Sequence, residues 1–279
     1  MMRNIFHTAA LILFFESCIL FSNAQSIDKQ NTITQDSVFT NSIGMKFIFI
    51  NPGSMIVGKF QPTVSKTSQS PDSVYKLALE MAKHDAMPGF EVTIEHAYYM
   101  GQFEVTQGQW KKIMGTNSSY FKGDKIKDDA NQHPVENVSW NDAQQFIKKL
   151  NEVEKGKAVY RLPSEFEWEY AARAGAKDDI SWNDIRKTAV IATTITSIVG
   201  KKQPNAWGLY DMLGNVWEWV QDFYNEKIFA DPVPSKKGKE HVLKGASFYG
   251  DVKNATYMTH AAGPASKYDV GFRVVMEIK

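Results

Sequence analysis

Cysteine is almost absent from this chain, which contains a single one, Cys18, among 279 residues. The rest of the chain therefore has no thiol with which to form a disulfide or to ligate a soft metal ion. An excess of charge is lacking too, because 32 basic residues are balanced by 31 acidic residues. This balance gives no electrostatic reason to expect nucleic acid or an anionic membrane as a partner, and neither is predicted.

The N-terminal apolar run is too short to span a bilayer, and no transmembrane segment is predicted. Arg3 precedes the apolar residues 8–15, and the small residues 22–24 come directly before Gln25. This order is typical of a secretory signal peptide over residues 1–24, which predicts export to the periplasm or the cell exterior. Lipid attachment at Cys18 is the alternative, but the residues before it match a lipobox poorly.

Residues 25–37 are polar and are predicted to form a flexible lead-in to one domain over residues 38–279. No repeat or long linker divides that domain. Strand-like residues 45–50 and 55–57 flank a Pro-Gly turn and predict a hairpin. Helix starts are predicted at three serine or threonine N-caps, which are Thr106, Ser139 and Ser164.

The stretch 204–219 holds three tryptophans and a tyrosine between turn-forming residues. So much aromatic surface predicts a buried segment without regular periodicity, whose peptide groups need partners. Asp211 and Glu218 supply hard oxygens around a glycine turn, as a calcium site requires. A plain turn with capped helix ends remains the other interpretation.

Several blocks, in this order, resemble the formylglycine-generating enzyme (sulfatase-modifying factor) domain family. They are residues 39–47, 104–106, 133–143, 160–173, 208–219 and 271–275. The resemblance covers nearly all of the chain after the lead-in. It implies an α+β, C-type-lectin-like fold with much irregular structure that is stabilised internally by calcium.

The family's calcium ligands can be carried over one by one. The resemblance implies that Asp211 and Glu218 bind calcium through their side chains, and that Gly214 and Val216 bind it through their main-chain carbonyls. A second calcium site of some relatives has no clear ligand pattern in the matching residues 180–200.

The family's two catalytic cysteines have no counterpart here. Counting from Ser247, their positions fall on Gly250 and Ala255, whose side chains cannot bind a metal. We therefore expect no bound copper and identify no catalytic residue. Some relatives present a ligand-binding face near the C-terminus, which implies a similar face at residues 247–269 here.

The polar and aromatic side chains of that segment are suited to peptide or glycan contacts, although its aromatics could equally fill the core. The predicted binding residues are Ser247, Phe248, Tyr249, Asn254 and Tyr257, with Tyr268 nearby.

Two functions follow from these features. The first is a non-catalytic, exported binding or structural component of the cell envelope, with a protein, peptide or glycan ligand. The alternative is an oxidoreductase that acts on protein or small thiol substrates through a cysteine-independent metal site. Tightly bound iron or copper would favour the second.

Overall fold

The computed structural model describes residues 37–58, 71–73, 75–76, 89–229, 233–251, 255–263 and 267–278. These belong to one compact unit that spans Gln35–Lys279. The predicted signal peptide, Cys18 and Asn254 lie outside the described residues. In the part that is described, no helix combines the length and the apolar character needed to cross a bilayer.

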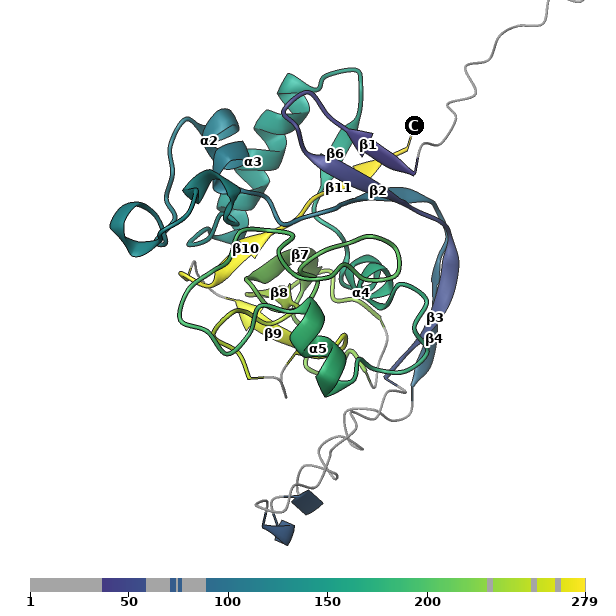
Figure 1. The fold of residues 1–279 in the computed structure, drawn as a ribbon. Helices are drawn as coiled ribbons and strands as arrows, with labels where there is room; N and C mark the ends of the chain where they lie inside the picture. Colours follow the sequence, from purple (N-terminus) through teal and green to yellow (C-terminus); the bar gives the residue numbers. More distant parts are fainter. Residues whose placement is uncertain are drawn as a thin grey trace, which may run out of the picture. The chain divides into compact units, whose positions relative to one another are not determined.

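Three sheets form the strand framework (Figure 1). The first has the order β1-β2-β5-β11-β6 and is antiparallel. Its strands are β1 (Val38–Thr40), β2 (Lys46–Ile50), β5 (Tyr98–Gly101), β11 (Val275–Glu277) and β6 (Val159–Arg161). The first and last parts of the domain are therefore neighbours in space.

The second sheet has the order β10-β7-β8-β9, and only its β10–β7 pair is parallel. It contains β10 (Val270–Phe272), β7 (Trp217–Phe223), β8 (His241–Lys244) and β9 (His260–Gly263). The third sheet is the antiparallel pair of β3 (Gly53–Val57) and β4 (Phe90–Ile94). The predicted hairpin between residues 45–50 and 55–57 is wrong, because β2 pairs with β1 and β5 while β3 pairs with β4.

All three helix starts predicted from capping residues are confirmed. Thr106, Ser139 and Ser164 each accept a hydrogen bond from the N3 backbone in a complete capping box. They begin α2 (Gln107–Met114), α3 (Trp140–Val153) and α4 (Glu165–Arg173). Helix α5 (Trp182–Thr188) begins after another cap, Ser181, which we did not predict from the sequence.

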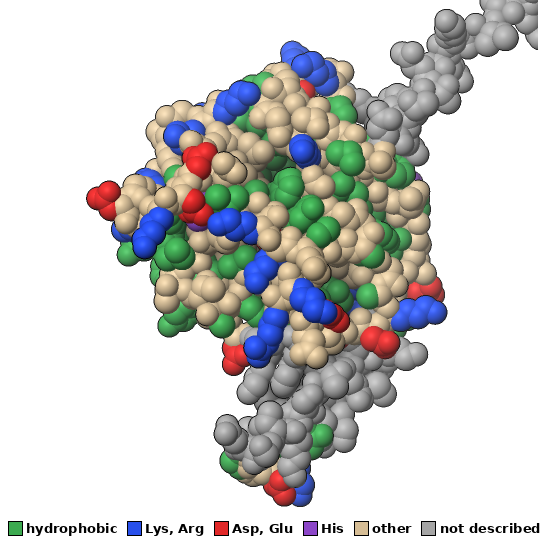
Figure 2. Space-filling model, viewed as in Figure 1, with side chains coloured by type: hydrophobic (Ala, Val, Ile, Leu, Met, Phe, Trp, Pro, Cys, Tyr) green, Lys and Arg blue, Asp and Glu red, His purple; other side chains and the backbone are tan. Residues whose placement is uncertain are grey.

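Two large apolar clusters divide the core. One packs α2 and α3 against β2, β10 and β11, with Phe47, Phe146 and Phe272 fully buried. The other surrounds Trp168 of α4, a helix that contacts β4, β7 and β8. Acidic and basic side chains both occur on the surface shown in Figure 2, in keeping with the net charge of +1.

One buried carboxyl holds a loop beside the core. Glu136 is fully buried and its Oε1 accepts a hydrogen bond from Phe121 N (2.8 Å), while its Oε2 is buried without a hydrogen-bond partner. Burial raises the pKa of Glu136 to about 7. The folded state therefore retains this proton at pH values where the unfolded chain releases it.

Because the pKa of Glu136 is raised on folding, the free energy of unfolding should fall as pH rises. The stabilising contribution that the raised pKa of Glu136 makes to the free energy of unfolding is fully present below pH 4.5. It is lost as pH rises through about 7. The loss amounts to about 3 kcal/mol of unfolding free energy. In Glu136→Gln this part of the decline should disappear, as measured by urea denaturation across that pH range. Glu152→Gln, on the exposed side of α3, should keep the wild-type slope, and an unchanged slope in Glu136→Gln would contradict the prediction.

Candidate functional site: a buried carboxylate centre

The aromatic stretch 204–219, which was predicted to be buried, includes a tight turn that runs into β7. Asp211, Gly214 and Asn215 all have positive φ, at 53°, 83° and 58°. A Cβ at Gly214 would lie 2.3 Å from Val190 O, so only glycine fits there. The stretch is not wholly irregular, since its last residues, from Trp217 onward, form β7, and Trp219 is buried in the core.

Glu218 points from β7 into a fully buried ion pair. Arg273 donates to both of its oxygens, from Nη2 to Oε1 (2.6 Å) and from Nε to Oε2 (2.7 Å). Trp168 Nε1 donates to Oε2 as well (2.7 Å). The guanidinium of Arg273 also donates to main-chain oxygens, which are those of Gly101, Tyr210 and Asp211. Arg273 therefore joins β5, β7 and the central turn through one side chain.

Glu104 is a member of this centre that the sequence did not predict. It is buried, and it accepts hydrogen bonds from Asn215 Nδ2 (2.6 Å) and Val216 N (3.1 Å). Burial raises the pKa of Glu104 well above its usual range, and the neighbouring Asp211 and Glu218 raise it further. The family-like block at residues 104–106 was its signal in the sequence. That block says nothing about which part of the chain Glu104 would contact.

Asp211 provides the acceptor that remains available to a cation. Its Oδ2 accepts from Gly200 N (2.6 Å), but its Oδ1 is buried without a hydrogen-bond partner. Burial raises the pKa of Asp211 to about 6. Unpaired buried oxygens are costly, and a bound cation is one way to compensate for them.

The unpartnered Oδ1 of Asp211 and the acidic surroundings fit a calcium ion, but one observation limits how many side chains could bind it. Arg273 pairs with Glu218, and the carboxyl groups of Glu104 and Asp211 lie near that pair, so negative charge is in excess when all three carboxyls are ionised. However, within the described ranges no group of three or more His, Cys, Asp or Glu side chains has the arrangement of a metal site. A calcium ion would therefore depend on Asp211, on main-chain oxygens such as those of Gly214 and Val216, and on Glu218 oxygens already bound by Arg273.

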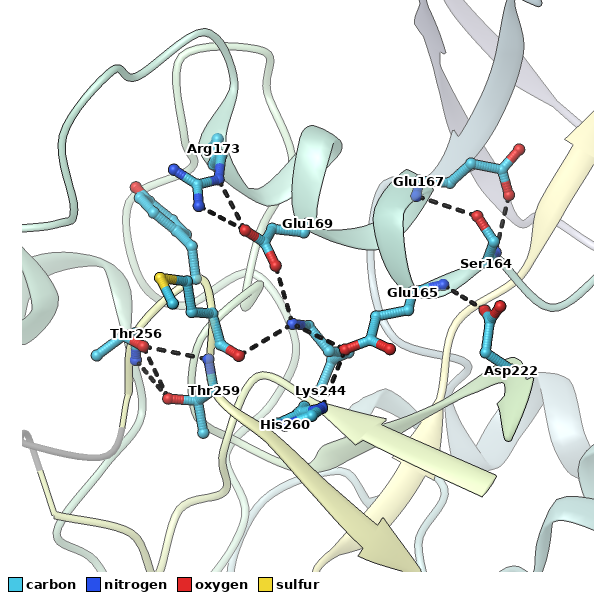
Figure 3. Close-up of polar contacts among 12 residues, drawn as sticks. Ser164, Glu165, Glu167, Glu169, Arg173, Asp222, Lys244, Thr256, Thr259 and His260 are labelled. Carbon is cyan, nitrogen blue, oxygen red and sulfur yellow. Dashed lines mark hydrogen bonds and ion pairs between the residues drawn. The ribbon is translucent and has the colours of Figure 1, made fainter. Parts of the chain in front are cut away.

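A second cluster of charged side chains lies between α4 and β8 (Figure 3). Lys244 is fully buried, and its Nζ lies 3.1 Å from Glu169 Oε2 and 3.8 Å from Glu165 Oε1. Arg173 Nε also donates to Glu169 (3.0 Å), and His260 Nδ1 lies 3.1 Å from Glu165 Oε1. Glu165 and Glu169 thus pair with Lys244, and the network joins α4 to the second sheet.

The structure separates the predicted binding residues into buried and exposed ones. Phe248 is fully buried and Tyr257 is 8% exposed, so placing them on a contact surface was wrong; both pack in apolar clusters. Ser247 is also buried, and its hydroxyl donates to Asp269 Oδ2 (3.0 Å). Tyr249, in contrast, is 68% exposed. Of the predicted face, Tyr249 therefore lies at the surface, whereas Phe248 is part of the core.

Gly250 and Ala255, the two positions that the resemblance assigns to the family's cysteines, lie in compact surroundings. Ala255 is fully buried in the cluster around Trp168. Gly250 N donates to Ser247 O (2.9 Å), and a Cβ at Gly250 would lie 3.1 Å from that oxygen. A larger side chain at Gly250 would thus require its neighbours to shift.

Comparison with known proteins agrees with the resemblance found in the sequence. The chaperone protein LppX of Paenibacillus barcinonensis is 27% identical over 239 residues, which covers 64% of this chain and 79% of LppX. The formylglycine-generating enzyme of Streptomyces coelicolor is 34% identical over 140 residues. That match spans 42% of each chain, well under two thirds of the enzyme's length.

Among solved structures, Treponema denticola variable protein 1 superimposes with a TM-score of 0.69 and 24% identity, over 85% of this chain and 97% of that protein. The fold is the expected α+β, C-type-lectin-like fold with few helices. The model of the Sulfatase-modifying factor enzyme 1-like domain matches residues 35–278. The chain therefore belongs to the Sulfatase-modifying factor enzyme 1-like domain family.

Proposed function

We propose that this protein is a non-catalytic, exported binding or structural component of the cell envelope, built on a calcium-stabilised scaffold. The observation that carries the proposal is the pair Gly250 and Ala255, at the positions that the resemblance assigns to the family's thiolates, in a chain whose single cysteine is Cys18. Inert side chains at both places cannot bind Cu(I) or pass electrons to oxygen.

Two further features support a binding role. LppX, which this chain matches over 79% of its length, is named a chaperone protein, and a chaperone acts by binding. The exposed Tyr249 lies directly before Gly250, so the segment that matches the family's reactive one presents an aromatic side chain to solvent. Export rests on the signal-peptide pattern of residues 1–24.

A peptide-conversion assay tests the non-catalytic proposal. The purified chain, supplied with copper and oxygen, is incubated with a cysteine-containing sulfatase peptide, and the peptide mass is measured. We expect no conversion of the cysteine to an aldehyde. An aldehyde product would contradict the proposal and favour an oxidoreductase. Stoichiometric copper or iron in the purified protein, together with oxygen consumption, would do the same.

Calcium should raise the thermal midpoint through Asp211. At about 100 times its dissociation constant, a ligand bound only to the native state adds about 2.7 kcal/mol, which is about 5–10 °C for a domain of this size. In Asp211→Ala the difference in Tm between calcium and chelator should fall to about 1 °C. This variant is a cleaner test than Glu218→Gln, which also breaks the pair with Arg273.

Asp124→Ala, in a short exposed 3-10 helix, is the matched control and should keep the full calcium response. If the wild-type midpoint does not respond to calcium, the calcium part of the proposal is wrong. A full response in Asp211→Ala would instead place the ion elsewhere.

A further inference from the structure

Away from the carboxylate centre, a hydroxyl, an imidazole and a carboxylate form a chain of contacts. His133 joins the other two groups, since its Nδ1 lies 2.9 Å from Thr196 Oγ1 and its Nε2 lies 2.7 Å from Asp128 Oδ1. His133 is 1% exposed and Thr196 is 2% exposed. At the outer end, Lys201 Nζ lies 3.1 Å from Asp128 Oδ2. The order of hydroxyl, imidazole and carboxylate is the one that activates a hydroxyl for acyl transfer.

The carboxylate of Asp128 determines which nitrogen of His133 carries the hydrogen. Hydrogen bonds from His133 and from Lys201 hold the pKa of Asp128 below its usual range, so Asp128 is ionised at neutral pH and can only accept. The Nε2 of a neutral His133 therefore carries the hydrogen, and Nδ1 keeps a lone pair. Because Nδ1 faces Thr196 Oγ1, the hydroxyl donates to it, which is the arrangement that a general base requires.

The nearest electrophile for Thr196 is the carbonyl carbon of the preceding residue, Ile195. Attack on it closes a small ring that contains Oγ1, Cβ, Cα and N of Thr196, so the two reacting groups are already held together. Thr193 Oγ1 donates a hydrogen bond to Ile195 O (2.9 Å). A donor at this oxygen stabilises the negative charge that develops there during the attack. Since Thr196 is buried, its own peptide bond has access to the hydroxyl that a separate substrate lacks.

Hydrogen bonds fix the chain on both sides of this peptide bond. On the N-terminal side, Thr193 N donates to Phe248 O (2.9 Å). On the C-terminal side, Ser197 N donates to Asn215 Oδ1 (2.9 Å), and Asn215 Nδ2 donates back to Ser197 O (3.3 Å). A backbone held in this way keeps the hydroxyl and the carbonyl beside His133, which lowers the entropic part of the barrier.

We propose that the chain cleaves its own peptide bond between Ile195 and Thr196. His133 Nδ1 takes the hydroxyl proton as Thr196 Oγ1 forms a bond to the Ile195 carbonyl carbon, and Thr193 donates to the resulting oxyanion. The C–N bond then breaks while His133 returns the proton to the Thr196 nitrogen. Ile195 is left as an ester on Oγ1, and Thr196 has a free amine. Water hydrolyses the ester to a carboxylate at Ile195 and restores the hydroxyl of Thr196.

This reaction occurs once in each chain and has no separate substrate, so it goes beyond the proposed function and does not depend on it. The two fragments should remain associated, because β11 of the second fragment pairs with β5 and β6 of the first. Aldehyde formation on a sulfatase peptide would contradict the non-catalytic assignment and leave self-cleavage unaffected. Failure of self-cleavage would leave that assignment unaffected.

Mass spectrometry of the purified full chain, denatured at intervals during incubation at neutral pH, tests the proposal. We expect two fragments, one that ends at Ile195 and one that begins with Thr196, which gel filtration without denaturant does not separate. Hydroxylamine attacks esters, so it should accelerate cleavage and leave a hydroxamate at Ile195. A chain that stays intact with and without hydroxylamine would overturn the proposal, and so would cleavage at another bond or without a hydroxamate.

Variants distinguish self-cleavage from the action of a contaminating protease. Thr196→Val should give no fragments, whereas Thr196→Ser keeps a hydroxyl and should still be cleaved. His133→Gln and Thr193→Val should each slow the reaction by at least about 100-fold. Thr188→Val is the control, because the hydroxyl of Thr188 donates to a main-chain oxygen of α5, and it should be cleaved at the wild-type rate. Cleavage of Thr196→Val at the wild-type rate would overturn the proposal. Hydroxamate formation in Thr196→Ser decides the test if the valine variant fails to fold.

Asp128 is a positioning residue, because it acts through the tautomer of His133. Asp128→Asn should slow cleavage by at least about 100-fold, whereas Asp128→Glu keeps an acceptor and should recover most of the rate. Equal rates in the two variants, measured by the same mass spectrometry, would overturn this role.

Discussion

Replacing Arg273 by glutamine should lower the free energy of unfolding by about 3–5 kcal/mol, because it leaves buried carboxylates without their cation. Arg273 is fully buried and donates to both oxygens of Glu218. Asp211 and Glu218 lie close enough to Glu104 to raise its pKa, and Glu218 also raises the pKa of Asp211. The measurement is urea denaturation at neutral pH, in the presence of chelator.

The effect should be specific to this buried pair. Lys187→Gln breaks the ion pair between Lys187 and Asp184, in which the two side chains are 58% and 54% exposed. This variant should lower the free energy of unfolding by less than about 0.5 kcal/mol. If Arg273→Gln costs no more than Lys187→Gln, the guanidinium does not hold the centre together as described.

Replacing Gly214 by alanine should cost about 4 kcal/mol, since it combines two penalties. Gly214 has φ +83°, which disfavours any residue with a Cβ. The new Cβ would also lie 2.3 Å from Val190 O, an oxygen that already accepts a hydrogen bond from Asn215 N. Both partners of that clash are backbone, so neither can move away cheaply.

A variant at a second glycine, Gly156, separates the cost of the positive φ from the cost of the steric clash. Gly156 has φ +80°, but a Cβ there would meet nothing within 4 Å. Gly156→Ala should therefore cost only the conformational part, about 1 kcal/mol. Thermal and urea unfolding of the two variants give the comparison, and similar losses in both would show that the close approach at Val190 does not matter.

The central turn shows how far a local pattern can be followed. The sequence pointed to Asp211, Gly214, Val216 and Glu218 as one site, and the structure places the first three in the turn that leads into β7 and Glu218 in β7 itself. It did not indicate Arg273 or Glu104. Arg273 is 55 residues from Glu218, and Glu104 is 111 residues from Asn215. No pattern of spacing connects residues so far apart.

The hairpin error has a similar cause. A Pro-Gly turn between two strand-like segments is a local signal, and it placed both strands nearly correctly. The choice of partner depended on strands that come later in the chain. Strand β5 pairs with β2, and β4 pairs with β3.

The sequence by itself determined the starts of α2, α3 and α4, the lack of thiols beyond Cys18 and the family, because caps, composition and motifs are properties of neighbouring residues. Tertiary structure alone decided which carboxylates meet a cation and which aromatics reach solvent. Phe248 and Tyr249 are adjacent, yet one is fully buried and the other is 68% exposed. Burial of this kind depends on which distant segments pack against a residue, and that is fixed only when the whole domain folds.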